Sequence, residues 1–180
     1  MLDGTVAVVS AFDPHSDGEA VKSRELILAL LRSAPEPFSR HTYTPGHITC
    51  TGAVLNPSRD KLLLVHHRRL DRWLLPGGHV EREDRTPEDS ARREVLEETG
   101  AELSASHGVL LNVDVHAIPP KKSEPLHLHH DLIWGFQALR EDLVCSEESR
   151  AVVWCGLQEF DRYDLPLPIR RAASRLIGSS

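Results

Sequence analysis

The chain has 180 residues, of which 27% are charged and 40% hydrophobic, and its formal net charge is −6 at pH 7. This length favours one main domain with a buried core, while the acidic balance argues against a nucleic-acid partner, because nucleic-acid binders usually carry a basic patch. No apolar run is long enough to span a membrane, and Cys50, Cys145 and Cys155 lack metal-type spacing, so we expect free thiols in a cytoplasmic protein.

Residues 1–45 are expected to form a short helical extension that packs on the main domain, since they are too few for a core of their own. One amphipathic helix is predicted at residues 18–33, and the prolines at positions 35 and 37 follow its end. Its apolar stripe comprises Val21, Leu26, Ile27, Leu28, Leu30 and Leu31.

Residues 46–180 are expected to form the main domain, in which strands dominate. A turn sequence at residues 56–60 predicts a hairpin between the first two strands. Strands are predicted at residues 48–55, 61–67, 72–75, 109–118, 126–139 and 151–156, and helices at residues 87–99 and 167–177. Mixed strands with two separated helices indicate either an α+β fold or a three-layer α/β/α sandwich.

The helix predicted at residues 87–99 has strong signals at both ends. Thr86 can cap its start, Pro87 suits the first position, Asp89 completes a capping box, and Gly100 supplies the stop. Most charge-rich helices are solvated surfaces with salt bridges, and Glu88 with Arg92 and Asp89 with Arg93 have the i,i+4 spacing for such pairs.

Three carboxylates do not fit that interpretation. Glu94, Glu97 and Glu98 stand at i, i+3 and i+4, so they crowd one face, and no base is three or four residues from Glu94 or Glu98. Each like-charge pair costs roughly 0.2–0.5 kcal/mol, and the helix dipole disfavours anions in the last turn. A hard cation such as Mg²⁺ or Mn²⁺ would convert this cost into a binding site.

The run Arg93-Glu94-Val95-Leu96-Glu97-Glu98-Thr99-Gly100 resembles the second half of the Nudix hydrolase box, G-x5-E-x7-R-E-U-x-E-E-x-G-U, where U is aliphatic. The first half departs from the pattern, because Asp84 replaces the glutamate that follows Gly78 and one extra residue precedes the helix. The resemblance covers about residues 46–178. It implies an α/β/α sandwich with a mixed sheet.

The resemblance also implies roles for these residues. Glu94 and Glu98 would hold Mg²⁺, with the Gly77 carbonyl as a backbone ligand, and Glu97 would be either a ligand through water or the base. Arg93 would orient the carboxylates, with Asp84 as its partner. The general base is either Glu97 or a glutamate on a loop outside the box. Glu147 and Glu148 are the candidates for that loop base, with ordinary surface charge as the alternative.

A second constellation lies on the strand predicted at residues 126–139. His127, His129 and Asp131 alternate, so they share one face, and His116 on the preceding strand could pair across to them. Three interpretations stay open: a solvated face, a His₂Asp transition-metal site, or a wall that contacts a diphosphate or nucleoside while Asp131 fixes the imidazole tautomers.

We favour the substrate wall, because the run from Glu124 to Asp131 resembles a Glu-Pro-x-His-x-His-x-Asp motif of some Nudix proteins. Arg69 and His79 are further candidates for substrate contacts. Lys121 and Lys122 are either a phosphate clamp or plain loop lysines.

The function implied is Mg²⁺-dependent hydrolysis of a nucleoside diphosphate linked to another moiety, a small-molecule substrate, with a homodimer as a family-based expectation. Two alternatives are kept. An isomerase of the isopentenyl diphosphate type shares this fold and uses a histidine-containing metal site with a cysteine, for which the histidine-rich strand and Cys50 are candidates. The other is a non-catalytic nucleotide-binding module, which would be expected to have a damaged glutamate set.

Overall fold

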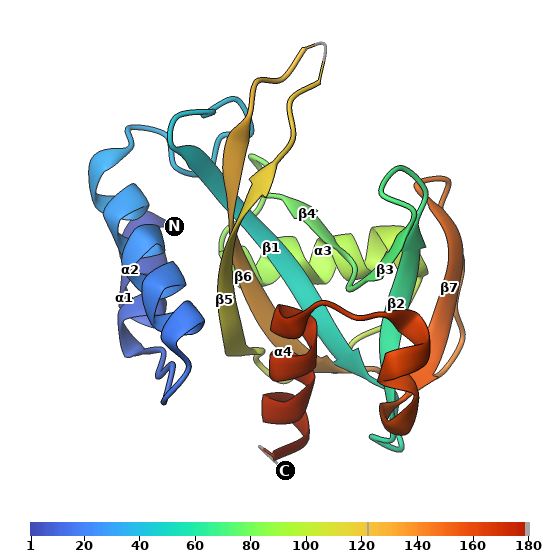
Figure 1. Ribbon diagram of the computed structural model, residues 1–180. Coiled ribbons are helices and arrows are strands. Elements are labelled where there is room, and N and C mark those ends of the chain that lie inside the picture. Colours follow the sequence, from blue (N-terminus) through green and yellow to red (C-terminus); the bar gives the residue numbers. More distant parts are fainter. Residues whose placement is uncertain (122, 179–180) are drawn as a thin grey trace.

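A computed structural model describes residues 1–121 and 123–178 (Figure 1). The helices are α1 (Leu2–Ala11), α2 (Gly18–Ser33), α3 (Pro87–Thr99) and α4 (Leu167–Gly178), with a 3₁₀ helix, η1, at Leu157–Tyr163. The strands are β1 (Gly46–Leu55), β2 (Lys61–His67), β3 (Arg72–Leu74), β4 (Gly77–His79), β5 (Val109–Ile118), β6 (His127–Gln137) and β7 (Ser149–Gly156). Within the described part of the chain, no helix is long and apolar enough to cross a bilayer. Lys122 lies outside the described residues.

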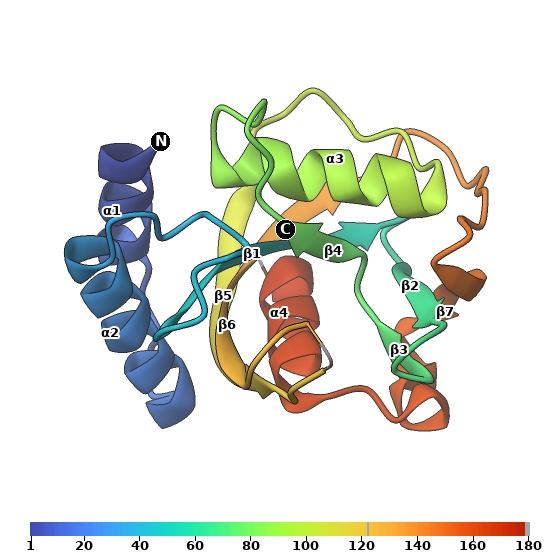
Figure 2. The same ribbon diagram turned by 90° about the horizontal axis from the view of Figure 1, so that it is seen from above.

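The strands form one mixed sheet in the order β3-β2-β1-β6-β5, with β4 paired to β1 and β7 paired to β2. The central pair, β1 and β6, runs parallel from Gly46 opposite Leu128 to Leu55 opposite Gln137, and the other pairs are antiparallel. Figure 2 shows α3 above the sheet and α4 below it. The predicted α/β/α sandwich with a mixed sheet is confirmed.

Strand β1 separates two hydrophobic cores because its side chains alternate between the faces. Cys50 and Val54 belong to the core that also contains Val95 of α3. Ala53 and Leu55 belong to the core beneath α4. A side chain at Gly52 would collide with Val95, so glycine at this position lets α3 approach the sheet closely.

The ends of α3 are those expected from its sequence. Thr86 Oγ1 accepts a hydrogen bond of 3.1 Å from the Asp89 amide, and an Asp89 carboxylate oxygen accepts one of 3.1 Å from the Thr86 amide. Gly100 has φ 65°, the left-handed conformation that glycine adopts at no steric cost. The register of Glu94, Glu97 and Glu98 is therefore fixed by local interactions.

The structure corrects several predictions at the level of elements. Helix α2 matches its predicted range, but Val21 and Leu26 are 42% and 49% exposed and lie outside the apolar stripe. Helix α1, strand β4 and η1 were not predicted. The hairpin between β1 and β2 pairs only Leu55 with Leu62, because β4 occupies the edge of β1 at residues 49–51.

The N-terminal helices pack on the rest of the chain. Helices α1 and α2 contact each other, and α2 lies beside the outer strand β5 (Figure 2). Asp17, which caps α2, also forms an ion pair of 3.0 Å with Arg171 on α4. The division into an extension of residues 1–45 and a main domain stays a prediction.

Two adjacent positions in α2 test this packing. Ile27 is fully buried, so we expect Ile27→Ala to lower the free energy of unfolding by about 2–5 kcal/mol through lost contacts and a cavity. Leu26→Ala, at an exposed position, is the matched control and should change it by less than about 0.5 kcal/mol. Urea unfolding followed by tryptophan fluorescence measures both values. Equal effects of the two substitutions would contradict the packing of α2 on the sheet.

Candidate active site

Arg93 of α3 is the centre of a polar network that joins three segments of the chain. Its Nε and Nη2 donate to the two oxygens of Asp84, at 3.1 and 3.0 Å, and Nη2 also donates to the carbonyl of His79 at 2.8 Å. Its Nη1 donates to Glu94 at 2.9 Å and to Glu97 at 3.0 Å. All five N–H groups of the guanidinium are thus used.

Asp84 makes the expected contact with Arg93, despite its shorter side chain and the extra residue before the helix. The same carboxylate accepts hydrogen bonds from the Glu81 amide at 2.8 Å and from Ser90 Oγ at 2.7 Å. Burial raises the pKa of Asp84, but hydrogen bonds from Arg93, Glu81 and Ser90 outweigh it and hold the pKa below its usual value. The carboxylate stays charged opposite Arg93.

Two predictions about charge on α3 are wrong. Asp89 does not pair with Arg93, because it serves in the capping box, whereas Glu88 does pair with Arg92 at 2.9 Å. Glu94 was expected to lack a basic neighbour, yet Arg93 pairs with it as well as with Glu97. A guanidinium can reach the residue next to it, which the i,i+3 and i,i+4 rule does not consider.

Glu98 remains without a cationic partner in the described part of the chain. It is only 7% exposed, and its Oε2 is buried with no hydrogen-bond partner. Burial, reinforced by the charges of Glu94 and Glu148, raises the pKa of Glu98 to about 8, while a backbone hydrogen bond from Gly77 acts in the opposite direction. Burial also raises the pKa of Glu94. This pair of carboxylates suits a divalent cation, which would supply the missing positive charge.

Strand β4 brings main-chain atoms directly against these carboxylates. Gly77 and Gly78 pair with Thr51 and Cys50 of β1, and a Cβ at Gly78 would lie 2.6 Å from Oε1 of Glu94. Glycine is therefore required for this close approach. The Gly77 main chain hydrogen-bonds to Glu98, and the role of its carbonyl as a metal ligand stays a prediction.

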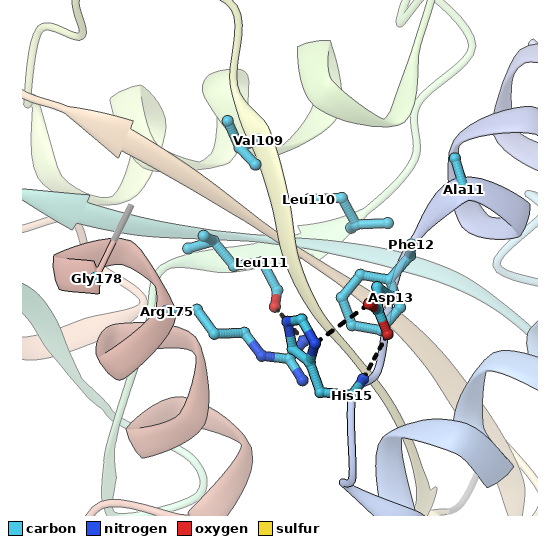
Figure 3. Close-up of a pocket in the computed structure, with 9 residues that line it drawn as sticks. All are labelled: Ala11, Phe12, Asp13, His15, Val109, Leu110, Leu111, Arg175 and Gly178. Atoms are coloured by element: carbon cyan, nitrogen blue, oxygen red, sulfur yellow. Dashed lines mark hydrogen bonds and ion pairs between the residues drawn. The ribbon is translucent and has the colours of Figure 1, made fainter. Parts of the chain in front are cut away.

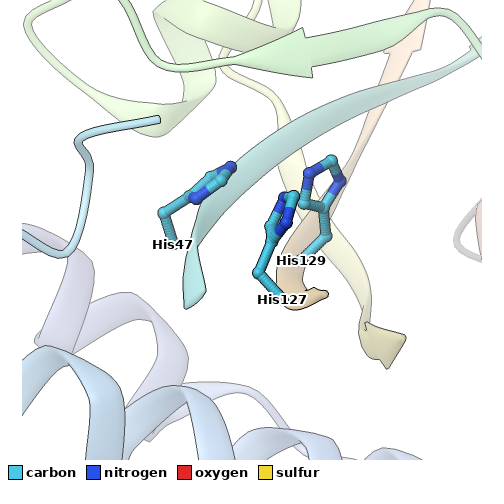
Figure 4. Close-up of side chains that lie close together, drawn as sticks. All are labelled: His47, His127 and His129. Atoms are coloured by element: carbon cyan, nitrogen blue, oxygen red, sulfur yellow. The ribbon is translucent and has the colours of Figure 1, made fainter. Parts of the chain in front are cut away.

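The predicted histidines form a second cluster. The rings of His127 and His129 lie 5.3 Å apart between centroids, and His47 of β1 lies 5.1 and 5.0 Å from them (Figure 4). His79 of β4 lies 5.1 Å from His47 and 5.4 Å from His129. His116 stands opposite His129 in the sheet, as expected. His47 was missed because it joins the cluster only through the parallel pairing of β1 with β6.

Asp131 does not fix the imidazole tautomers as expected. Its carboxylate accepts hydrogen bonds from Thr49 at 3.0 Å and from Thr51 at 2.9 Å, and the residue is buried between β1 and β6. The Nδ1 of His127 bonds instead to the carbonyl of Pro125 at 2.9 Å. Asp131 therefore connects the two central strands.

Two further predicted contacts lie apart from the histidines. Arg69 is exposed in the turn between β2 and β3, where its amide bonds to His67. Lys121 pairs with Glu124 at 2.7 Å, as an ordinary loop lysine does. Neither contact places these side chains in the cluster.

One hollow of the described surface lies away from both groups. It has a volume of about 400 Å³ and lies between α1, β5 and α4 (Figure 3). Arg175 lies at this hollow and donates to the carbonyl of Leu111 at 2.8 Å. No residue of α3 or of the histidine cluster lines it.

The buried charge of Glu98 gives a test of stability. Its pKa is near 4.5 when unfolded and about 8 when folded, so the cost of ionising it is absent below pH 4.5 and complete above pH 8. In chelator-treated protein we expect Glu98→Gln to raise the free energy of unfolding by about 1–3 kcal/mol at pH 8. The gain should vanish near pH 4.5. Urea unfolding at both pH values measures it, with the exposed Glu102→Gln as control. An equal gain at both would contradict the assignment.

Comparison with known proteins agrees with this architecture. The NUDIX domain model matches residues 46–176. A putative 8-oxo-dGTP diphosphatase of Bacillus subtilis is 40% identical over 101 residues, which are 55% of this chain and 60% of that protein. A probable DHNTP pyrophosphohydrolase of Lactococcus lactis is 40% identical over 74 residues, 40% of this chain and 43% of that protein. The chain thus matches less than two thirds of either relative.

Solved structures show the same fold. A NUDIX family hydrolase from Clostridium perfringens superposes with a TM-score of 0.53 at 19% identity, over 74% of this chain and 98% of the other. A MutT NUDIX hydrolase from Burkholderia pseudomallei gives a TM-score of 0.52 at 25% identity, over 72% of this chain and 96% of the other. The family model covers most of the chain, and helix α3 and strand β4 lie within the matched residues. The chain therefore belongs to the NUDIX domain family.

Proposed function

We propose that this protein is a Mg²⁺-dependent hydrolase that cleaves a phosphoanhydride bond of a nucleoside diphosphate linked to another moiety. The observation that carries the proposal is the buried, unpartnered Oε2 of Glu98, beside Glu94 and under the glycine strand β4. Family membership supports hydrolysis, and the nucleotide names of the two relatives support a nucleotide-derived substrate. A homodimer and a cytoplasmic location stay predictions.

The proposed ligands are Glu94, Glu98 and the carbonyl of Gly77, and Glu97 is either a further ligand through water or the base. Oxygen donors of this kind suit Mg²⁺, and Mn²⁺ can substitute. When bound, the ion supplies positive charge to the phosphate oxygens and makes a nearby water more acidic. Arg93 holds one oxygen each of Glu94 and Glu97, which leaves their other oxygens free to act as ligands. Arg93 is therefore a positioning residue.

The general base must take a proton from the attacking water. Glu97 is the first candidate, because its side chain is 58% exposed and reaches solvent at the edge of the site. Glu148 is the second, because its charge raises the pKa of both Glu94 and Glu98 and it therefore lies near them. Its neighbour Glu147 uses its main-chain carbonyl to bind Arg68.

Of the predicted substrate contacts, His79 is the one we retain. It is half-buried, and its carbonyl bond to Arg93 fixes it at the end of β4, two residues from Gly77. His127 and Asp131 are buried and Arg69 lies in a separate turn, whereas the half-buried His129 stays a prediction. Burial lowers the pKa of His79 to about 4, so at pH 7 the ring would contact a nucleotide as a neutral group.

The position of Cys50 does not support the isomerase alternative, which needs a cysteine beside the histidines. Cys50 faces α3, on the opposite side of β1 from Thr49 and Thr51, whereas His47 shares the face of these threonines. Burial raises the pKa of its thiol well above the usual value, which disfavours the reactive thiolate. The glutamate set is complete, which also separates this chain from the non-catalytic alternative.

Loss of one carboxylate tests the proposed activity. We expect Glu98→Gln to lower kcat by about 10²–10⁴-fold with Mg²⁺, since charge neutralisation at the phosphate depends on the ion it holds. The assay measures release of nucleoside monophosphate from nucleoside triphosphates, including 8-oxo-dGTP, and from nucleotide sugars. Glu102→Gln, on the exposed segment after α3, is the matched control. Wild-type turnover by Glu98→Gln would refute the proposal.

A second pair of variants assigns the base. If Glu97 takes the proton, Glu97→Gln should lower kcat by about 10²–10⁴-fold and abolish the acidic limb of the pH profile, because that limb reports protonation of the base. Glu148→Gln should then keep the limb and alter kcat by less than about tenfold. The reverse pattern would transfer the role to Glu148. Profiles of kcat from pH 5 to 9, measured at saturating Mg²⁺, distinguish the two.

A further inference from the structure

A group of three histidines is separate from the carboxylates of α3. His47, His127 and His129 each place a ring nitrogen within 4.8 Å of those of the other two (Figure 4). His47 comes from β1 and the other two from β6, and the parallel register sets His47 directly opposite His129. The three rings therefore converge through the pairing of the two central strands.

Hydrogen bonds to main-chain carbonyls fix the tautomers of two of these rings. The Nδ1 of His47 lies 3.1 Å from the carbonyl oxygen of Thr42, and the Nδ1 of His127 lies 2.9 Å from that of Pro125. A carbonyl oxygen only accepts, so each Nδ1 carries the hydrogen and each Nε2 presents a lone pair. Metal-binding histidines have this arrangement, in which the outer nitrogen donates to a carbonyl and the inner one binds the ion.

The lone pair of His47 has no partner. His47 is fully buried, and its Nε2 makes no hydrogen bond. An unsatisfied buried polar atom costs about 1–3 kcal/mol, so an explanation is required. Stacking of His47 on His127 does not explain this unpaired atom, because Nε2 of each ring is an acceptor and neither can donate a hydrogen bond to the other.

We propose that His47, His127 and His129 bind one transition-metal ion of the Zn²⁺ class, at a site distinct from the Mg²⁺ carboxylates. Imidazole nitrogen suits Zn²⁺, Co²⁺ and Ni²⁺, whereas Mg²⁺ prefers oxygen. Tetrahedral Zn²⁺ with nitrogen ligands at about 2.0–2.1 Å needs nitrogens about 3.4 Å apart, so small side-chain rotations close the site.

Three protein ligands would leave one position of a tetrahedral ion for solvent or another ligand. His47 and His127 are buried, while His129 is half-buried and gives the ion a route from solvent. His79 lines the open side, with its ring 5.4 Å from that of His129. The Tyr43 ring packs edge-on against His127 at 5.2 Å.

Metal binding tests the proposal directly. Tag-free, metal-stripped protein is titrated with Zn²⁺ against a chromophoric chelator at pH 7.5, and Co²⁺ is then used as a spectroscopic probe. We expect one Zn²⁺ per chain at this site and intense visible Co²⁺ bands typical of few nitrogen ligands. His129→Ala should weaken Zn²⁺ binding by at least about 100-fold and remove the bands, because it deletes a ligand.

The controls separate this site from the carboxylates and from misfolding. The double variant Glu94→Gln with Glu98→Gln should retain the Zn²⁺ stoichiometry and the Co²⁺ bands. His107→Ala is the matched histidine control, since its side chain is fully exposed. Circular dichroism verifies that His129→Ala is folded, and His127→Gln gives a second loss of a ligand that keeps a polar side chain.

Two results would overturn the proposal. One is failure of wild-type protein to bind Zn²⁺ at micromolar concentration. The other is retention of the same affinity and Co²⁺ spectrum by folded His129→Ala or His127→Gln. Loss of Zn²⁺ binding in the Glu94→Gln, Glu98→Gln double variant would assign the ion to the carboxylates instead, and would also overturn it.

Discussion

The guanidinium of Arg93 is the interaction on which the rest of the site depends. It joins the loop before α3 through Asp84, strand β4 through the carbonyl of His79, and the helix itself through Glu94 and Glu97. A planar fork with five donors can hold these groups at once, whereas an ammonium has three donors and no fixed geometry. Two of the carboxylates, Glu94 and Glu97, are thereby held at one guanidinium nitrogen, beside the strand that His79 ends.

Strand β4 is the point at which two chemically different groups meet. Its glycines lie against Glu94 and Glu98, while the ring of His79 lies with the histidines. Successive side chains of β1 point to opposite faces of the sheet, so Cys50 faces α3, whereas Thr49 and Thr51 face the side of Asp131. The glutamates of α3 and the imidazoles at the end of the central strands are therefore separate groups, and this separation would allow them to select different cations.

Local signals explain which parts could be predicted from the sequence. Helix α3 was predicted with its ends because Thr86, Asp89 and Gly100 act within a few residues of one another. Helix α1 was missed because its glycine, threonine and valines are weak helix formers, and it is held by contacts with α2. The place of His47 required the parallel pairing of strands about 80 residues apart, which no local pattern specifies.

The two proposed metal sites share one feature, which is a buried polar atom without a hydrogen-bond partner. Six buried side-chain nitrogen or oxygen atoms among the described residues lack a partner, and two of them, Oε2 of Glu98 and Nε2 of His47, stand within groups of ligand-type side chains. Asp131 shows that this sheet can satisfy a buried carboxylate, since Thr49 and Thr51 bind it from the facing strand. No hydroxyl group of this kind donates a hydrogen bond to Oε2 of Glu98 or to Nε2 of His47. Each is therefore destabilising in the metal-free protein, and each would be relieved by a cation that matches its donor type, a hard ion for the carboxylates and a borderline ion for the imidazoles.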